Sequence, residues 1–155
     1  MDSPHAIDSD QAGQIQDASR LEALGRAIKQ VQYRHHRAVD TGLMDIGTTL
    51  AQWDALRAIG RQPGASAHDL AVYTFQSDQA FGTLANRLIR QGLIERRPGR
   101  GRRIEHHLTT PGLEMLETGY PVSQAVLQNS FTDLNEQERT TLLYLLRQIL
   151  DRPLG

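Results

Sequence analysis

Apolar residues along the first third of the chain recur at the spacing of a single helix face. Leu21, Leu24, Ile28 and Val31 are separated by three, four and three positions, and the basic residues between them fall largely on other faces. This pattern predicts an amphipathic helix over about residues 16–39. The apolar stripe is longer than a small core needs, and we therefore expect part of it to contact a second chain.

Three shorter helices are predicted in the middle of the chain, over about residues 50–60, 66–73 and 77–91. Each begins beside a residue whose side chain can accept a hydrogen bond from the first turn, namely Thr49, Ser66 and Ser77. Thr49 with Gln52 and Ser66 with Asp69 have the spacing of capping boxes. The last two helices, joined by a tight turn, have the form of a helix-turn-helix.

Alternation of apolar and polar residues then predicts two short strands, over residues 93–96 and 104–108. Between them lies the sequence Pro98-Gly99-Arg100-Gly101, whose glycines can adopt the positive φ angles of a hairpin tip. The sequence therefore predicts a β-hairpin with an arginine-rich tip.

Two further helices are predicted at the C-terminal end. The first begins at about Thr109–Pro111 and runs to about Ser130, with a bend expected near Pro121 because proline removes one helical hydrogen bond. Asn135 with Glu138 has the spacing of a capping box for the last helix. Apolar residues cover more than one face of that helix: Leu142, Leu143, Leu145, Leu146, Ile149 and Leu150. Burial on two sides, and hence a dimer interface, is expected there.

Composition narrows the class of protein. The 155 residues fit one compact subunit, and the absence of cysteine excludes disulfides, thiol redox sensing and cysteine-based metal sites. No apolar run approaches the length of a membrane span, and the opening residues lack the pattern of a signal peptide. We therefore expect a cytoplasmic protein that does not contact membranes. Residues 1–15 are rich in aspartate and poor in bulky apolar residues, which predicts a disordered tail.

Charge is concentrated in one segment. Residues 86–103 contain seven of the seventeen basic residues and a single acid, Glu95, although the whole chain has a formal net charge of −1. Such a concentration is typical of a site for a polyanion, and double-stranded DNA is the first partner to consider.

The segment from Leu70 to Gly112 resembles the MarR (multiple antibiotic resistance regulator) family of winged helix-turn-helix regulators. The matching positions are Leu70-Ala71, Leu84, Arg87-Leu88, Gly92-Leu93, Glu95-Arg96 and Leu108-Thr109. The segment TLAQWDAL, residues 49–56, is similar to the helix that precedes the motif in that family. With the flanking helices, the resemblance covers nearly the whole chain after the tail.

The resemblance implies a mainly α fold with a small β-hairpin wing. Residues 16–155 would form a single subunit, with a winged helix-turn-helix lobe over 49–109 and dimerisation helices over 16–40 and 111–155. It also implies a homodimer that places two recognition helices in major grooves of a pseudo-palindromic operator and two wings at the minor groove. The expected activity is that of a sequence-specific transcriptional regulator, a repressor released by a small aromatic ligand.

Two groups of residues are expected to contact DNA. The polar outer side of the recognition helix can approach base edges and phosphates: Ser77, Asp78, Gln79, Gly82, Thr83, Asn86 and Arg87. The arginines of the wing can meet phosphates or a narrow minor groove: Arg96, Arg97, Arg100, Arg102 and Arg103. A glycine at position 82 would allow either close approach of the helix backbone to DNA or tight packing against another helix. Asp78 can either read a base or interact favourably with the helix dipole.

The wing departs from the family pattern. Arg102 matches the usual wing arginine, whereas Arg100 stands where the family has an aspartate that braces that arginine. For the ligand we expect a crevice near Tyr33, His36 and Trp53, which offer aromatic surface with polar tips; ordinary packing at the helix junction is the alternative.

Other functions remain open at this point. A winged helix can serve as a protein-interaction module, and histidines from separate segments can form a zinc-responsive site in the same fold. Adjacent histidines do not chelate by themselves, because His35-His36 diverge on a helix and His106-His107 face opposite sides of a strand. We therefore predict no metal site and no cofactor. No nucleophile motif or glycine-rich phosphate loop indicates an enzyme.

Overall fold

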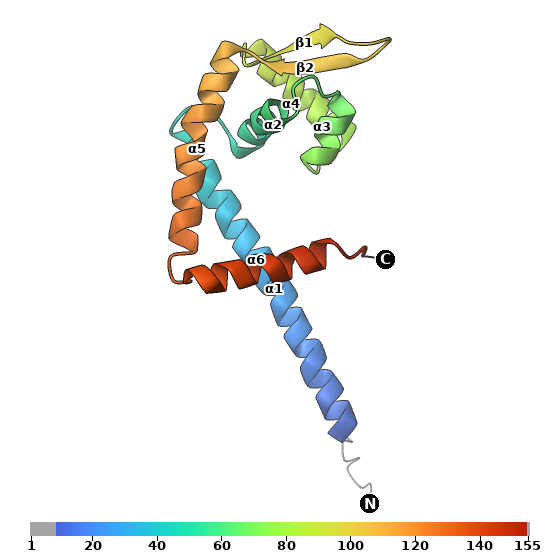
Figure 1. Cartoon of the computed structure of the whole chain (residues 1–155), viewed down its shortest axis with the longest axis vertical. Coiled ribbons are helices and arrows are strands. Elements are labelled where there is room, and N and C mark those ends of the chain that lie inside the picture. Colours follow the sequence, from blue (N-terminus) through green and yellow to red (C-terminus); the bar gives the residue numbers. More distant parts are fainter. Residues whose placement is uncertain (1–8, 155) are drawn as a thin grey trace, which may run out of the picture. The chain divides into compact units, whose positions relative to one another are not determined.

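The computed structural model describes residues 9–154 of the chain as six helices and one two-stranded sheet (Figure 1). Contacts group these residues into two units, one up to Arg37 and one from Ala38 onward. The predicted mainly α fold with a β-hairpin is confirmed. No helix among the described residues has the length and apolar character needed to cross a bilayer.

Helix α1 spans Ser9–Met44 and is longer at both ends than the sequence pattern indicates. Residues 9–15, which we expected in the disordered tail, are helical; the rest of that tail lies outside the described residues. Glutamine and alanine are good helix formers, and Asp10 lies in the first turn, where a negative charge favours the helix dipole. Hydrophobic periodicity misses such a polar helical extension, because it detects only buried faces.

The second unit begins with the end of α1 and continues through α2 (Leu50–Arg61), α3 (Ala67–Tyr73) and α4 (Asp78–Arg90). The Thr49 hydroxyl accepts a hydrogen bond from the Gln52 backbone, but Gln52 does not complete the predicted capping box. Its side chain instead accepts a hydrogen bond from Thr48 in the protein interior. The capping box of Ser66 and Asp69 forms as predicted.

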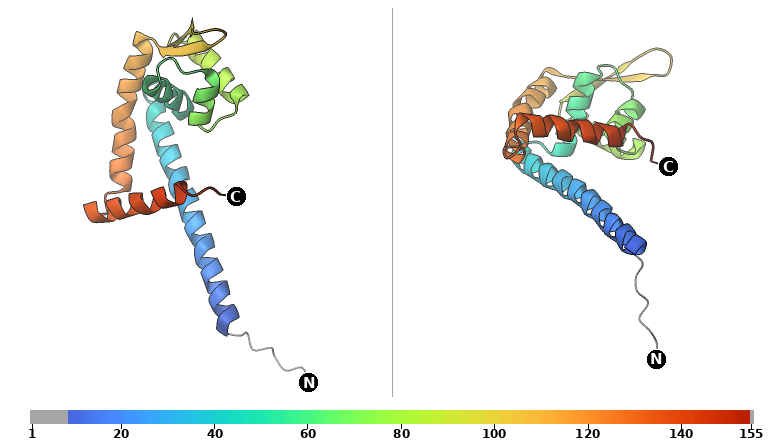
Figure 2. Two further views of the ribbon diagram at one scale, coloured as in Figure 1. Left: turned by 45° about the vertical axis from the view of Figure 1, so that its right-hand side comes forward. Right: turned by 60° about the horizontal axis from the view of Figure 1, so that its bottom comes forward.

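The hairpin consists of β1 (Ile94–Pro98) and β2 (Ile104–Leu108), paired antiparallel with Arg96 opposite His106. At its tip only Gly101 has a positive φ, of 62°. Gly99 has another role than predicted, because a Cβ there would lie 3.0 Å from the Glu105 side chain. The right-hand view of Figure 2 shows the tip extending beyond the neighbouring helices.

Helices α5 (Thr110–Ser130) and α6 (Glu136–Leu150) complete the chain. Two glycines position α5 against the lobe: a Cβ at Gly112 would overlap the Leu93 carbonyl, and one at Gly119 would overlap the Trp53 indole. The predicted capping box of Asn135 and Glu138 forms at the start of α6. None of the residues of α6 is buried within the chain.

One apolar core holds the helix-turn-helix and the hairpin together. The largest buried apolar side chains come from the end of α1 and from α2, α3, α4 and β1: Leu43, Trp53, Leu56, Ile59, Leu70, Phe81, Leu88 and Ile94. The Trp53 indole donates a hydrogen bond to the Leu116 carbonyl at 3.1 Å, which ties α2 to α5. This core fixes the position of α4 and of the hairpin beside it.

The turn between α3 and α4 contains a strained residue. Phe75 has a φ of 57° and a side chain that is 98% exposed. The backbone N–H groups of Phe75 and Gln76 donate to the carbonyls of Val72 and Ala71. This is the Schellman arrangement, in which the left-handed residue is usually glycine.

Phe75→Gly is therefore expected to raise the free energy of unfolding by about 1 kcal/mol, because a left-handed conformation costs about 1–2 kcal/mol for a residue with a Cβ. Urea unfolding followed by circular dichroism measures the change. Phe75→Ala is the matched control, since it removes the ring but keeps the Cβ. Equal stability of the two variants would contradict the strain at this position.

Candidate nucleic-acid interface

Helix α4 has one apolar and one polar face. Phe81, Ala85 and Leu88 are buried in the core, whereas Thr83 and Asn86 are exposed on the outer side. The Ser77 hydroxyl caps the helix by accepting a hydrogen bond from the Ala80 backbone at 3.1 Å. The predicted division of the recognition helix into a core face and a polar face is therefore confirmed.

Asp78, in the first turn of α4, is paired with a histidine. His68 Nδ1 on α3 lies 3.0 Å from Asp78 Oδ1, and both side chains are largely exposed. The carboxylate also lies where a negative charge favours the helix dipole. Asp78 therefore has a local structural role, and base readout by this residue stays a prediction.

Gly82 lies in the interior of α4, where alanine would be preferred by about 1 kcal/mol. A Cβ built at Gly82 meets no atom within 4 Å. Packing inside the chain therefore does not require glycine here, which removes one of the two interpretations of this residue. The backbone of α4 is open to close approach from outside at this position.

Several arginines of the hairpin are held by neighbouring groups. The Arg97 Nε donates to Glu95 Oε1 at 2.9 Å. Arg103 donates to Asp69 Oδ2 at 3.3 Å, which joins the end of the wing to α3. Hydrogen bonds from Ser66 and the charge of Arg103 lower the pKa of the Asp69 carboxyl. Arg103, rather than Arg102, is thus the braced arginine of this wing.

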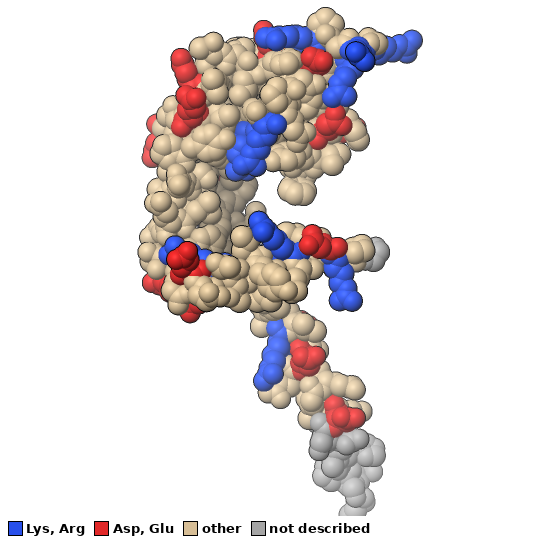
Figure 3. Space-filling view, in the orientation of Figure 1, with Lys and Arg blue, Asp and Glu red and all other residues tan. Residues whose placement is uncertain are grey.

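The guanidinium groups of four arginines in the basic segment make no hydrogen bond or ion pair with any residue that the structure describes: Arg87, Arg90, Arg100 and Arg102. Figure 3 shows basic side chains gathered over the hairpin at the upper right of the view. Exposed guanidinium groups without acidic partners repel one another, and a bound polyanion relieves this repulsion. The surface is suited to phosphate groups.

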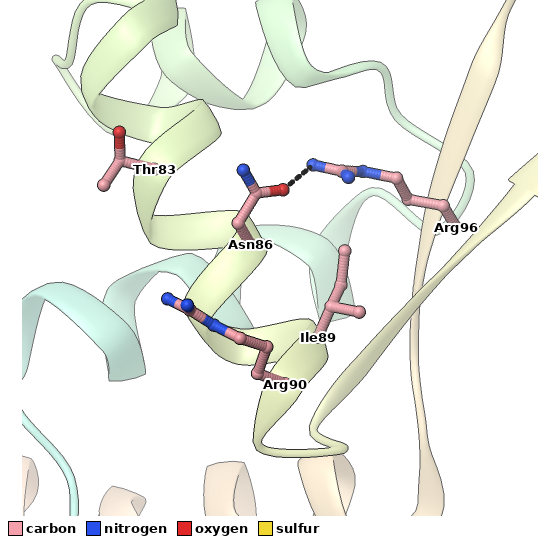
Figure 4. Close-up of a pocket in the computed structure, with 5 residues that line it drawn as sticks. All are labelled: Thr83, Asn86, Ile89, Arg90 and Arg96. Atoms are coloured by element: carbon pink, nitrogen blue, oxygen red, sulfur yellow. Dashed lines mark hydrogen bonds between the residues drawn. The ribbon is translucent and has the colours of Figure 1, made fainter.

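A notch of about 460 Å³ lies where α4 meets β1 (Figure 4). It is lined by Thr83, Asn86, Ile89, Arg90 and Arg96. Across it, the Arg96 guanidinium donates to Asn86 Oδ1 at 2.9 Å. The wing and the recognition helix thus form one continuous surface with hydrogen-bond donors.

Arg90 is absent from the residues that the sequence assigned to this surface. Its spacing could have identified it, since Thr83, Asn86 and Arg90 are three and four positions apart and therefore share one face of α4. The structure shows that Arg90 lines the notch with the other two. The basic residues Arg87 and Arg90 thus both extend the polar face of α4.

The residues expected near a ligand occupy different environments. Trp53 is 1% exposed and lies in the core, with its ring edge against Tyr120. Tyr33 is 57% exposed, and its hydroxyl accepts a hydrogen bond from Arg37. His36 is exposed on α1. A ligand site at these residues stays a prediction.

The histidines of the hairpin face opposite sides, as predicted. His106 is buried, whereas His107 Nε2 lies 3.0 Å from Glu105 Oε2. Within residues 9–154, no group of three His, Asp or Glu side chains is arranged to hold a metal ion.

Comparison with known proteins places the chain among transcriptional regulators. Residues 46–104 match the model of the MarR family. The HTH-type transcriptional repressor NicR of Pseudomonas putida is 26% identical over 132 residues, which cover 84% of each chain. Residues 46–104, the segment that matches the family model, contain the helix-turn-helix and most of the hairpin.

Solved structures are similar over most of the chain. A mutant of E. coli MarR in complex with operator DNA has a TM-score of 0.77 and 26% identity, and the match covers 84% of this chain and 96% of that one. Bordetella bronchiseptica BpsR, whose DNA binding is regulated by 6-hydroxynicotinic acid, has a TM-score of 0.71 and 26% identity, with 81% and 92% covered. The fold, the polar recognition helix, the basic hairpin and these similarities together support assignment of the chain to the MarR family of winged-helix transcriptional regulators.

Proposed function

We propose that this regulator binds a pseudo-palindromic DNA operator as a homodimer and represses transcription until a small aromatic ligand releases it. The observation that carries the proposal is the continuous surface of α4 and the hairpin, which the bond from Arg96 to Asn86 joins. Arginine side chains without partners among the described residues flank this surface. Bases would be read by the exposed polar side chains of α4. The proposal places the protein with DNA in the cytoplasm and includes no catalytic activity.

The wing arginines would contact the sugar-phosphate backbone. The side chains of Arg100 and Arg102 have no partner among the described residues and are therefore free to reach phosphates or a narrow minor groove. Arg97 and Arg103 can add charge but already make bonds within the chain. Because phosphate contacts position a protein without carrying sequence information, specificity is assigned to α4.

A dimer is supported by apolar surface that the single chain leaves uncovered. Leu21 and Leu24 on α1 are 63% and 54% exposed, and Leu143 and Leu150 on α6 are 50% and 81% exposed. Exposed leucines at helical spacing on both terminal helices are typical of an interface between subunits. Two-fold symmetry then requires half-sites about one helical turn, roughly 10 bp, apart.

Release by a ligand is supported by the similarity to BpsR, which 6-hydroxynicotinic acid regulates. For this chain we propose an aromatic acid as the ligand class, with Tyr33, His36 and Trp53 as candidate contacts. A ligand releases DNA only if it binds the released arrangement more tightly, by on the order of 1–3 kcal/mol.

Selection of genomic DNA fragments by the purified protein tests this function. A palindromic motif should be enriched, and its affinity should exceed that of random duplex by at least about a thousandfold. The genes beside the selected fragments would indicate the ligand, which can then be tested for release of the protein. Equal binding of all fragments, or binding of none at low salt, would contradict the proposal.

Gly82→Ala separates stability from DNA binding. We expect the free energy of unfolding to rise by about 1 kcal/mol, because alanine is the better helix former and its methyl group meets no atom. Operator affinity should fall by about 1–3 kcal/mol, the usual cost of disturbing one base-pair contact. Fluorescence anisotropy with a labelled operator and urea unfolding measure the two effects.

Gly13→Ala on α1 is the matched control, because a Cβ there also meets nothing within 4 Å. It should leave operator affinity unchanged. Unchanged affinity of Gly82→Ala as well would remove Gly82 from the DNA-binding surface.

A further inference from the structure

His106 is a titratable side chain in the core, directly behind the proposed DNA-binding surface. It is 1% exposed, and its ring lies edge to face with Phe81 of α4 at a centroid distance of 6.3 Å. Its Nδ1 lies 3.1 Å from the carbonyl oxygen of Ala65, just before α3. Its Nε2 lies 3.3 Å from the Nε of Arg96 on the paired strand.

These two partners fix the proton on the ring. A guanidinium Nε–H can only donate, so His106 Nε2 must accept from Arg96. A carbonyl oxygen can only accept, so His106 Nδ1 must carry the proton and donate to Ala65. The geometry therefore requires the neutral ring with its hydrogen on Nδ1. A second proton on Nε2 would set two donors against each other.

The same guanidinium extends to the recognition helix. While Arg96 Nε donates to His106, its terminal amino group donates to Asn86 Oδ1 at 2.9 Å (Figure 4). An exposed arginine has many rotamers, and two fixed bonds select one of them. A chain of hydrogen bonds thus runs from Ala65 through His106 and Arg96 to Asn86 on the outer face of α4.

We propose that His106 is a positioning residue for DNA binding: its neutral ring holds Arg96 against Asn86 and thereby sets the wing relative to the recognition helix. The inference rests on the proposed function, because the positioned groups belong to the proposed DNA-binding surface. The His106 ring itself does not contact DNA. Its protonation releases Arg96 and weakens the connection between the wing and α4.

The surroundings of His106 oppose protonation. Burial lowers the pKa of His106 below its ordinary value of 6.5, and the nearby charges of Arg96 and His107 act in the same direction, while the Ala65 carbonyl acts against them. Arg96 approaches from the paired strand and His107 follows on the same strand, whereas α4 presents the uncharged Phe81. The neutral ring therefore persists at pH 7.

The sign of the pH effect follows from this depressed pKa. The folded protein binds fewer protons at His106 than the unfolded chain, so this group's contribution to stability is complete above pH 6.5 and is lost as the pH falls through the lower, folded value. Operator affinity should decline in the same acidic window, because the fully protonated ring no longer accepts from Arg96.

Operator affinity measured from pH 8 down to the lowest pH at which circular dichroism shows each variant folded tests the proposal. His106→Gln keeps an uncharged acceptor for Arg96, and His106→Leu fills the space without one. We expect wild-type affinity to fall relative to His106→Gln by up to roughly tenfold once the pH is below the folded pKa of His106, and His106→Leu to bind roughly tenfold more weakly than wild type at pH 7.5, as for a lost hydrogen bond to a charged group.

His107→Gln is the control on the same strand: it removes one nearby charge but keeps the bond from Arg96 to His106, so operator affinity should still fall at acidic pH. Identical profiles of wild type and His106→Gln, or wild-type affinity of His106→Leu, would overturn the role of His106. Failure of wild-type protein to bind any duplex at neutral pH would instead overturn the proposed function itself.

A second readout does not depend on DNA. In the free protein labelled with ¹⁵N at histidine and arginine, long-range nitrogen–proton spectra should show His106 protonated on Nδ1 alone at pH 7.5. The Arg96 Nε–H signal should be shifted from the position of an exposed arginine and should move there in His106→Leu. A proton on Nε2, or an unchanged Arg96 signal, would show that the hydrogen-bond chain does not form.

Discussion

Truncation before Asn135 is expected to yield monomers that bind the operator at least a hundredfold more weakly than the full chain. The truncation removes α6, whose side chains are unburied within the subunit. Helix α6 exposes apolar residues on more than one side: Leu142, Leu143, Tyr144, Leu145, Ile149 and Leu150. Removing a helix that contributes so little to the core of its own subunit should leave residues 38–130 folded.

The monomer binds more weakly because it cannot occupy two half-sites of the operator at once. Once one subunit of a dimer is bound, the second half-site is met at an effective concentration in the millimolar range, which raises affinity by about 10²–10⁴ over a single module. A monomer loses this term even if its own α4 and hairpin are intact. Sedimentation velocity at micromolar concentration and anisotropy with the labelled operator measure the two consequences.

A point substitution tests the same interface without shortening the chain. Leu145→Glu places a charge on the exposed apolar side of α6 and should likewise give monomers. Thr140→Glu adds the same charge on the other side of the helix and should remain dimeric. A truncated protein that is dimeric and fully active would overturn the assignment of α6 to the interface.

The local elements of this fold could be predicted from sequence because their signals are local. Ser66 with Asp69 and Asn135 with Glu138 form capping boxes at the predicted positions. The second strand has the predicted bounds, residues 104–108. In each case the residues that decide the structure lie within a few positions of one another, so a short stretch of sequence is enough to predict the element.

Contacts between segments that lie far apart in the chain could not be predicted from the sequence. The basic segment predicted a charged surface, but not that Arg103 pairs with Asp69 thirty-four positions away while Arg102 has no side-chain partner in the part of the chain that the structure describes. Similarly, a histidine in a strand gives no sign of its partners, and only the fold brings His106 to Ala65, forty-one positions earlier. Such pairings depend on how the strands and helices pack, which residue spacing does not encode.

The interpretation of Gly82 illustrates the same limit. Its sequence context left packing and DNA approach equally plausible, because both favour a residue without a side chain. The structure removes packing within the chain, since a Cβ would meet nothing within 4 Å. The remaining explanation for a glycine at position 82 is close approach of a molecule outside the subunit to the backbone of α4.

Raising the salt concentration from 50 to 200 mM is expected to weaken operator binding by about 10³–10⁴, the second large effect. If six to eight phosphates are neutralised, log K falls with log salt at a slope of roughly −5 to −7. The basic segment can supply this number, since Arg87, Arg90, Arg100 and Arg102 are unpaired in each subunit among the described residues. Two subunits double the number of arginines available.

Arg102→Ala should flatten that slope by about one unit per subunit contact removed and should weaken operator and random duplex alike, because a phosphate contact carries no sequence information. Arg26→Ala removes an exposed arginine outside the basic segment and should leave the slope unchanged. Anisotropy titrations at five salt concentrations give all three slopes. A wild-type slope near zero would mean that the arginines of the hairpin contact no phosphates, and the surface would then fit an acidic protein partner better than DNA.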